Sequence, residues 1–222
     1  MKKPLDTKKT VMRWIIYAAG MIILAAGIIT TTKGLLGVSP IISVPYIVSD
    51  ITGFNFGNLT FFYYIFLVTL QYIIRGKHSR IYDLLQIPVS LVFTRFMNLF
   101  SAMITYQPDK LWIKILIVVI GITLTGIGLS MTVWMDLIVN PGDGIVQALS
   151  WKIHKGLGLC KNIIDLSSVA ATFIIGLCTG RLLFGIGLGT VIAMVLTGRV
   201  VAIFTKLAKK PLLQAAGLPY AE

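Results

Sequence analysis

The 222-residue chain is too apolar and too sparsely charged for an ordinary water-soluble domain. Hydrophobic residues make up 56% of it and charged residues only 13%, about half the charged fraction of a typical soluble protein. A soluble chain of this composition would have to expose large apolar patches. We therefore expect an all-α integral membrane protein, because helices satisfy their backbone polar groups within lipid.

The charged residues are strongly unbalanced, with 20 Lys and Arg against eight acids and a net charge of +12. Such a balance is also typical of nucleic-acid-binding proteins. Here, however, the basic residues flank apolar runs, so the expected partners are anionic lipid headgroups and not nucleic acid. Two isolated cysteines and two isolated histidines predict neither a disulfide framework nor a metal site, and no cofactor motif is present.

In chain order, six stretches approach the roughly 20 apolar residues that a transmembrane helix needs. They are residues 11–32, 59–74, 81–103, 111–134, 163–179 and 182–204. The pieces 38–51 and 141–153 are apolar but too short to span. The N-terminus resembles a signal peptide, but no cleavage site follows cleanly before Lys33, so a retained first span is expected.

Fixed cations predict the orientation of these spans. With the N-terminus in the cytoplasm, fourteen of the 20 Lys and Arg fall inside and four outside, in agreement with the positive-inside rule. The inside set is Lys2, Lys3, Lys8, Lys9, Arg13, Arg75, Lys77, Arg80, Lys152, Lys155, Lys161, Lys206, Lys209 and Lys210. We expect the protein to lie in a bacterial inner membrane, with both termini on the cytoplasmic side.

The chain also carries a weak internal repeat. Two glycines seven residues apart are followed, thirteen residues later, by a proline in each half. They are Gly20, Gly27 and Pro40 in residues 1–105, and Gly121, Gly128 and Pro141 in residues 106–222. Because each half contains three spans, the second copy would be inserted upside down, as in many transporters. The glycines themselves are expected to allow close helix packing.

The prolines mark the sharpest candidate sites. Ser39 and Asn140 are good helix N-caps, and Pro40 and Pro141 favour the first helical position. Each pair therefore predicts a short half-helix that starts after a break. These helices could begin at a cavity between the repeats or lie at the membrane surface. Asp143, close behind, could bind a cation, accept a proton or only cap its helix.

Arg95 and Arg199 fall inside the third and sixth predicted spans, where an unpaired guanidinium is costly. They could reach the membrane surface with their long side chains. Alternatively, they could neutralise an anionic solute or join the two halves through Asp165 in the fifth span. Both readings stay open at this point.

Together, the glycine-rich first span, Gly37-Val-Ser-Pro40, Asn140-Pro-Gly-Asp143 and the following Gly-Leu-Gly158 resemble the bacterial YczE/YyaS/YitT family of inner-membrane proteins. The resemblance covers nearly the whole chain and implies a multi-span membrane protein without an established substrate. The fold resembles the six-span substrate-capture subunits of vitamin importers more remotely. The Ala-x-x-x-Ala spacing typical of those subunits is missing from the first span.

These features favour a small-solute permease with its site between the repeats. The candidate binding residues are Ser39, Pro40, Asn140, Pro141, Asp143, Arg95 and Arg199, with Asp165 as a proton or charge partner. The alternatives are a capture subunit of a multicomponent importer, or a membrane partner protein that transports nothing. A homodimer is compatible with each of them. No nucleophile–base set or metal cluster favours an enzyme.

Overall fold

A computed structural model of the chain describes residues 7–219, and within them it contains helices and no strand. The helices are α1 (Thr7–Lys33), α2 (Pro40–Thr52), α3 (Phe56–Arg75), α4 (Gln86–Met103), α5 (Leu111–Trp134), α6 (Pro141–Ile153), α7 (Leu157–Thr179) and α8 (Leu188–Ala215). The short 3₁₀ turns η1 (Gly76–His78) and η2 (Ile81–Leu85) connect α3 to α4. Six helices, all except α2 and α6, are long and apolar enough to cross a membrane. The predicted all-α, six-span membrane fold is confirmed.

Three predicted spans begin five or six residues away from their predicted starts, and the last one also ends later. α4 begins at Gln86 instead of 81, and α8 ends at Ala215 instead of 204. α7 begins at Leu157, six residues before the predicted start at 163, and α8 begins at Leu188 instead of 182. Residues 182–187 are apolar but form no helix, because their backbone holds the α1–α2 connection. Val38 donates to the carbonyl of Gly185 at 3.0 Å, and Gly189 donates to the carbonyl of Leu36 at 2.6 Å.

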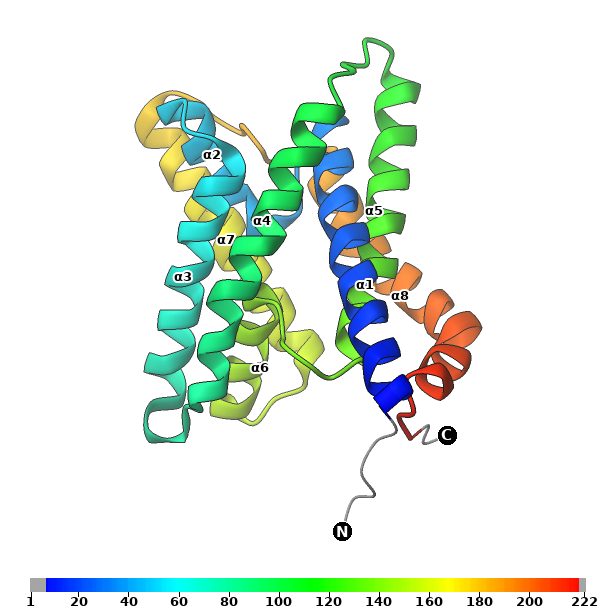
Figure 1. Cartoon of the computed structure of the whole chain (residues 1–222). Coiled ribbons are helices and arrows are strands. Elements are labelled where there is room, and N and C mark those ends of the chain that lie inside the picture. The colour runs from blue at the N-terminus through cyan, green and yellow to red at the C-terminus, as the bar shows by residue number, and fades with distance from the viewer. Residues whose placement is uncertain (1–6, 220–222) are drawn as a thin grey trace.

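α1 and α5 run in opposite directions and pack closely at the centre of the molecule (Figure 1). Glycines from both helices meet at this crossing. A Cβ atom on Gly20 would lie 3.1 Å from the carbonyl oxygen of Gly128, and one on Gly121 would lie 2.9 Å from that of Gly27. The four glycines therefore bring the two backbones together, as small residues do between membrane helices.

Most of the other large contacts between helices fall into matched pairs. α2 packs against α7 as α6 packs against α3, and α1 packs against α4 as α5 packs against α8. α2 occupies the upper half of the molecule and α6 the lower half (Figure 1). This pairing agrees with two halves related by inversion about the α1–α5 crossing. The repeat itself, with bounds 1–105 and 106–222, stays a prediction, and its terminal residues 1–6 and 220–222, Lys2 and Lys3 among them, lie outside the described residues.

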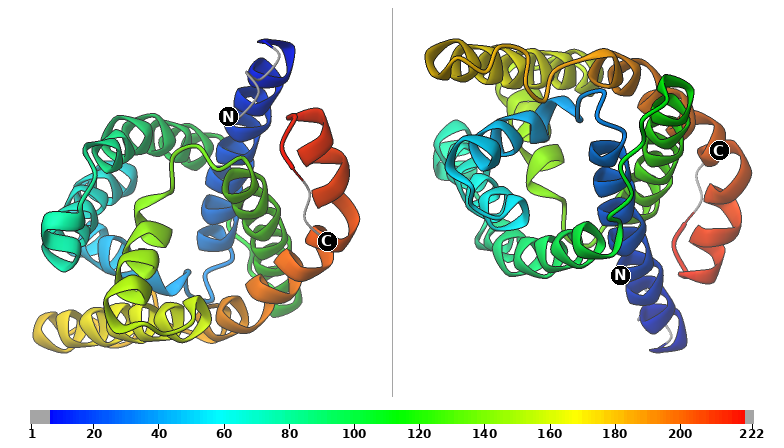
Figure 2. Two further views of the ribbon diagram at one scale, coloured as in Figure 1. Left: turned by 90° about the horizontal axis from the view of Figure 1, so that it is seen from below. Right: turned by 90° about the horizontal axis from the view of Figure 1, so that it is seen from above.

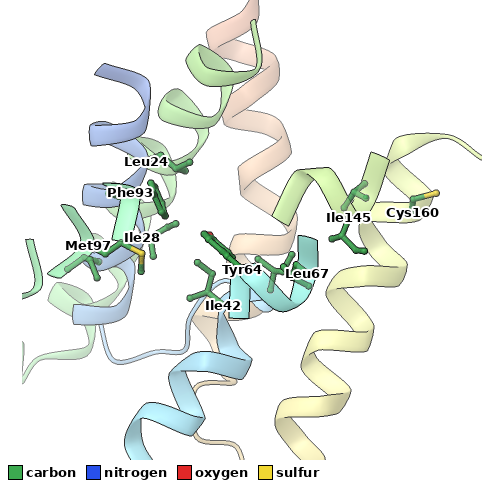
Figure 3. Packing of buried hydrophobic residues seen from close by; sticks show 13 residues of the cluster. Leu24, Ile28, Ile42, Tyr64, Leu67, Phe93, Met97, Ile145 and Cys160 are labelled. Carbon is green, nitrogen blue, oxygen red and sulfur yellow. The ribbon is translucent and has the colours of Figure 1, made fainter. Parts of the chain in front are cut away.

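The largest core cluster joins α1, α2, α3, α4, α6 and, through Cys160, α7. Figure 3 shows Tyr64 between Ile42 of α2 and Leu67 of its own helix. Its ring stacks on that of Phe93 in α4, with the ring centroids 6.1 Å apart. Seen along the helices, α6 lies inside the ring that the spanning helices form (Figure 2).

Both ends of the described chain lie at one end of the molecule. Gly217, just after α8, lies against the side chain of Lys9 in α1. The α3–α4 connection reaches the same end as the last turn of α6, since the rings of His78 and Trp151 are 4.9 Å apart. The cations that the sequence assigns to one side of the membrane therefore gather at one end of the fold.

Candidate functional site

A cavity of about 550 Å³ lies between α1, α2, α5, α6, α7 and α8. Both half-helix starts line it, through Ser39 and Pro40 of one and Asn140 and Gly142 of the other. Ile41 and Gly142 are neighbours, because a Cβ on Gly142 would lie 3.2 Å from Cδ1 of Ile41. The two breaks in the chain thus meet inside the molecule, where irregular backbone needs a polar or protein surround.

In both half-helices a capping residue followed by proline gives the first turn nearly the same backbone conformation. Ser39 and Asn140 have nearly equal backbone angles, with φ −56° and −61° and ψ 138° in both. In each case the carbonyl before the proline accepts the N–H groups of the residues three and four positions further along the chain, at 2.8–3.1 Å. The caps differ, because the Asn140 side chain accepts the Gly142 N–H at 3.0 Å whereas the Ser39 side chain caps nothing.

Hydrogen bonds from the spanning helices fix the half-helices. Gln71 of α3 donates to the carbonyl of Pro141 at 3.2 Å and exchanges amide hydrogen bonds with Gln86 of α4 at 3.0 and 3.2 Å. Gly144 leaves room for the Gln71 amide, since a Cβ there would meet it at 2.6 Å. α2 is held to α7 by a 2.7 Å hydrogen bond between the hydroxyls of Ser43 and Thr172.

Three charged side chains line the cavity, all on α6 and α7. Lys161 forms a 2.5 Å ion pair with Asp165, which is buried. Asp143, in the first turn of α6, interacts electrostatically with both but forms no ion pair of its own among the described residues. When all three groups are ionised, one ammonium and two carboxylates leave the cavity with one negative charge in excess. No group of three metal-ligating side chains occurs in the part of the chain that the structure describes.

The structure brings together six of the predicted site residues and separates two. Ser39, Pro40, Asn140, Asp143 and Asp165 line the cavity, and Pro141 is buried beside it. Arg95 and Arg199 are exposed on α4 and α8 and do not line it. Arg95 donates to the side chain of Asn58 at 2.5 Å. Asp165 pairs with Lys161, and among the described residues it forms no ion pair with either arginine.

Several lining residues were not predicted from the sequence. Lys161 was assigned to a loop, because the fifth span was expected to begin only at 163. Tyr64 lines the cavity, and its hydroxyl is hydrogen-bonded to the side chain of Asn140. A signal for it exists, since Thr60, Tyr64 and Gln71 form a buried polar stripe at helical spacing on α3.

The comparisons with known proteins agree with this fold. Residues 11–206 match the model of a family described as "Family of unknown function (DUF6198)". The chain is also 27% identical over 193 residues to the "Uncharacterized membrane protein YczE" of Bacillus subtilis (strain 168), covering 86% of this chain and 84% of that protein. No solved structure matches. The resemblance to YczE is thereby confirmed, and the chain belongs to the DUF6198 family of membrane proteins.

Proposed function

We propose that this protein is a multi-pass permease for a small solute, with its binding site in the cavity where α2 and α6 begin. The observation that carries the proposal is Asp143, an acidic side chain placed among apolar helices, which forms no ion pair with any described residue. A charge in such a position is costly and usually marks a substrate or ion path. Half-helices that start at matching places of two repeats are the strongest sequence sign of a transporter site.

A second cavity supports a route through the molecule. It has a volume of about 540 Å³ and lies between η1, η2 and the α5–α6 connection, at the end where the termini gather. Gln147 of α6 lines both cavities. A movement of the half-helix α6 alone would therefore connect them, which is the type of gating expected when one repeat moves against the other.

The charges of the site favour a solute with a positive group. The two arginines that led to the expectation of an anion lie elsewhere, whereas Asp143 and the Lys161–Asp165 pair line the cavity. A solute with an ammonium or guanidinium group, or a proton that travels with the solute, would compensate the carboxylate of Asp143. Asp143 is the essential residue in both cases, whether a cationic solute or a co-transported proton compensates its charge.

The test is a ligand-stabilisation screen of the purified protein, followed by flux of the best solute in proteoliposomes. Bound solutes raise the unfolding temperature by mass action. We expect stabilisation and flux in the wild type and in Asp109→Asn, an exposed loop variant outside the cavity, and loss of both in Asp143→Asn. Solute flux that Asp143→Asn leaves unchanged would contradict the proposed site. Stabilisation without flux would favour a capture subunit.

A further inference from the structure

On the α7–α8 side, the central cavity is lined by residues that are also exposed at the outer surface of the protein. Both helices line it, yet they do not pack along each other, whereas α3 and α4, their counterparts in the first half, do. Between α3 and α4 the side chains of Phe93 and Met97 are completely buried. On the α7–α8 side, lining residues remain open, with Leu157 56% and Met194 43% exposed.

Two chemically different walls face each other across this cavity. The α6–α7 wall carries Asn140, Asp143, Lys161, Asn162 and Asp165. The wall made by α1, α5 and α8 carries no charge and is largely apolar, with Leu24, Ile122, Leu129, Ala193 and Val201 among its side chains. Its polar groups are the hydroxyls of Thr31, Thr125, Ser130 and Thr197. A fully polar solute would leave the largely apolar wall without a partner, and a fully apolar one would leave the carboxylates without one. A molecule with a polar head and an apolar body satisfies both.

The charge of the head follows from the α6–α7 wall. Lys161 and Asp165 neutralise each other at 2.5 Å, so the remaining charge is that of Asp143. A cationic head is complementary to it, and an anionic head is repelled.

We infer, on the basis of the proposed permease function, that the solute is an amphipathic cation that enters sideways from the bilayer through the opening between α7 and α8. Its head binds at Asp143, and its apolar body lies against α1, α5 and α8. The α3–α4 side is closed by packed side chains and the α7–α8 side is not, so the entrance lies between α7 and α8. The exposed faces of both helices keep the apolar body in contact with lipid on the way.

The experiment uses the full chain in nanodiscs of neutral phosphatidylcholine and measures the unfolding temperature with three probes. Octyltrimethylammonium is an amphipathic cation, tetramethylammonium is the head without a body, and octyl sulfate is an amphipathic anion. Since about two buried methylenes change an affinity roughly tenfold, octyltrimethylammonium should stabilise the protein at a concentration at least ~10-fold lower than tetramethylammonium. Octyl sulfate should not stabilise it. Asp143→Asn should abolish the effect, and Asp109→Asn should keep it.

A pair of tryptophan variants tests the entrance. Gly198 lies on the cavity side of α8 with no atom within 4 Å of a built Cβ, so Gly198→Trp fills the opening without a clash at its Cβ. Gly156, before α7, has equally free space but does not line the cavity. Gly198→Trp should lose the octyltrimethylammonium effect, and Gly156→Trp should retain it. If Gly198→Trp does not fold, Met194→Trp on the same wall takes its place.

The outcomes separate the two proposals. Tetramethylammonium as effective as the octyl probe, stabilisation by octyl sulfate, or an unchanged effect in Gly198→Trp would overturn the amphipathic cation and its lateral entry. A permease for a water-borne solute would survive each of these results. A dimer in the disc that buries α7 and α8 would also overturn lateral entry. The permease itself falls only if no solute in the wider screen depends on Asp143.

Discussion

The α1–α5 crossing depends on the absence of four side chains. Each Cβ added there would meet backbone of the opposite helix. At Gly128 all three nearest atoms are backbone, from Leu24 and Gly20, so no side chain could move aside. The two helices would have to separate, and α4 and α8 pack on them. The glycines thus determine the spacing of the whole bundle.

We predict that Gly128→Ala destabilises the protein by about 1–3 kcal/mol, which is the usual cost of overpacking. Gly198→Ala is the matched control, since it makes the same change in an α-helix where a Cβ has free space. It should be neutral or stabilising by about 0.5–1 kcal/mol, because glycine disfavours helices. Thermal unfolding in detergent measures both. Equal effects of the two variants would show that the crossing is not tightly packed.

The amide pair of Gln71 and Gln86 gives a second prediction at the scale of residues. Both side chains are buried and exchange two hydrogen bonds, so Gln86→Leu removes partners from an amide that water cannot reach. We expect a loss of about 1–3 kcal/mol, and none for Gln107→Leu in the exposed α4–α5 connection.

A double-mutant cycle separates the pair from its surroundings. Gln71→Leu also removes the hydrogen bond to Pro141, so it should cost more than Gln86→Leu. The double variant should then cost less than the sum of the two single variants, by about 0.5–3 kcal/mol. Additive losses would mean that the two amides do not stabilise each other.

Among the elements, the half-helices α2 and α6 differ in how their first turns are capped. Asn140 accepts a hydrogen bond from Gly142, whereas the Ser39 side chain accepts none from its helix. Asn140→Ala should therefore cost about 1 kcal/mol of stability, and Ser39→Ala less than about 0.5 kcal/mol. Chemical denaturation of the purified variants measures the difference. A larger loss for Ser39→Ala would indicate that this hydroxyl caps α2 in solution.

The same elements show what the sequence could and could not predict. The limits of α6 were predicted to the residue, since a cap followed by proline is a local signal that needs no tertiary information. The start of α8 was not, because residues 182–187 are apolar but are held by backbone bonds to a distant connection.

The candidate site was predictable only in part, for a similar reason. Asp143 and the two breaks belong to local patterns. The placement of Arg95 and Arg199 depends on how far α4 and α8 are rotated about their axes. That rotation follows from packing, and in both helices it turns the arginine to the outer surface.

At the scale of the whole molecule, most contacts between helices have a counterpart in the other half, and a few do not. Matched pairs of helices suit a protein that can open in two opposite senses, because each contact has a counterpart of similar strength. α3 with α4 and α7 with α8 break this match, one pair packed and the other apart. In the permease proposed above, such an asymmetry would belong to a single conformation, in which one side is closed while the other is open.

The direction of the molecule in the membrane is the last prediction. The ends of α1 and α8 lie together with η1 and the end of α6, where most fixed cations are found, so this end should face the cytoplasm. In a background with Cys160→Ala and Cys178→Ser, which removes both native thiols, a membrane-impermeant maleimide should label Asp109→Cys in intact cells. It should label Lys77→Cys only after the membrane is permeabilised. The opposite pattern would reverse the orientation, and with it the side from which the cavity beside η1 is reached. Labelling of both positions in intact cells would be incompatible with six spans. Lys77 and Asp109 lie beyond opposite ends of α4, so α4 would then not cross the membrane.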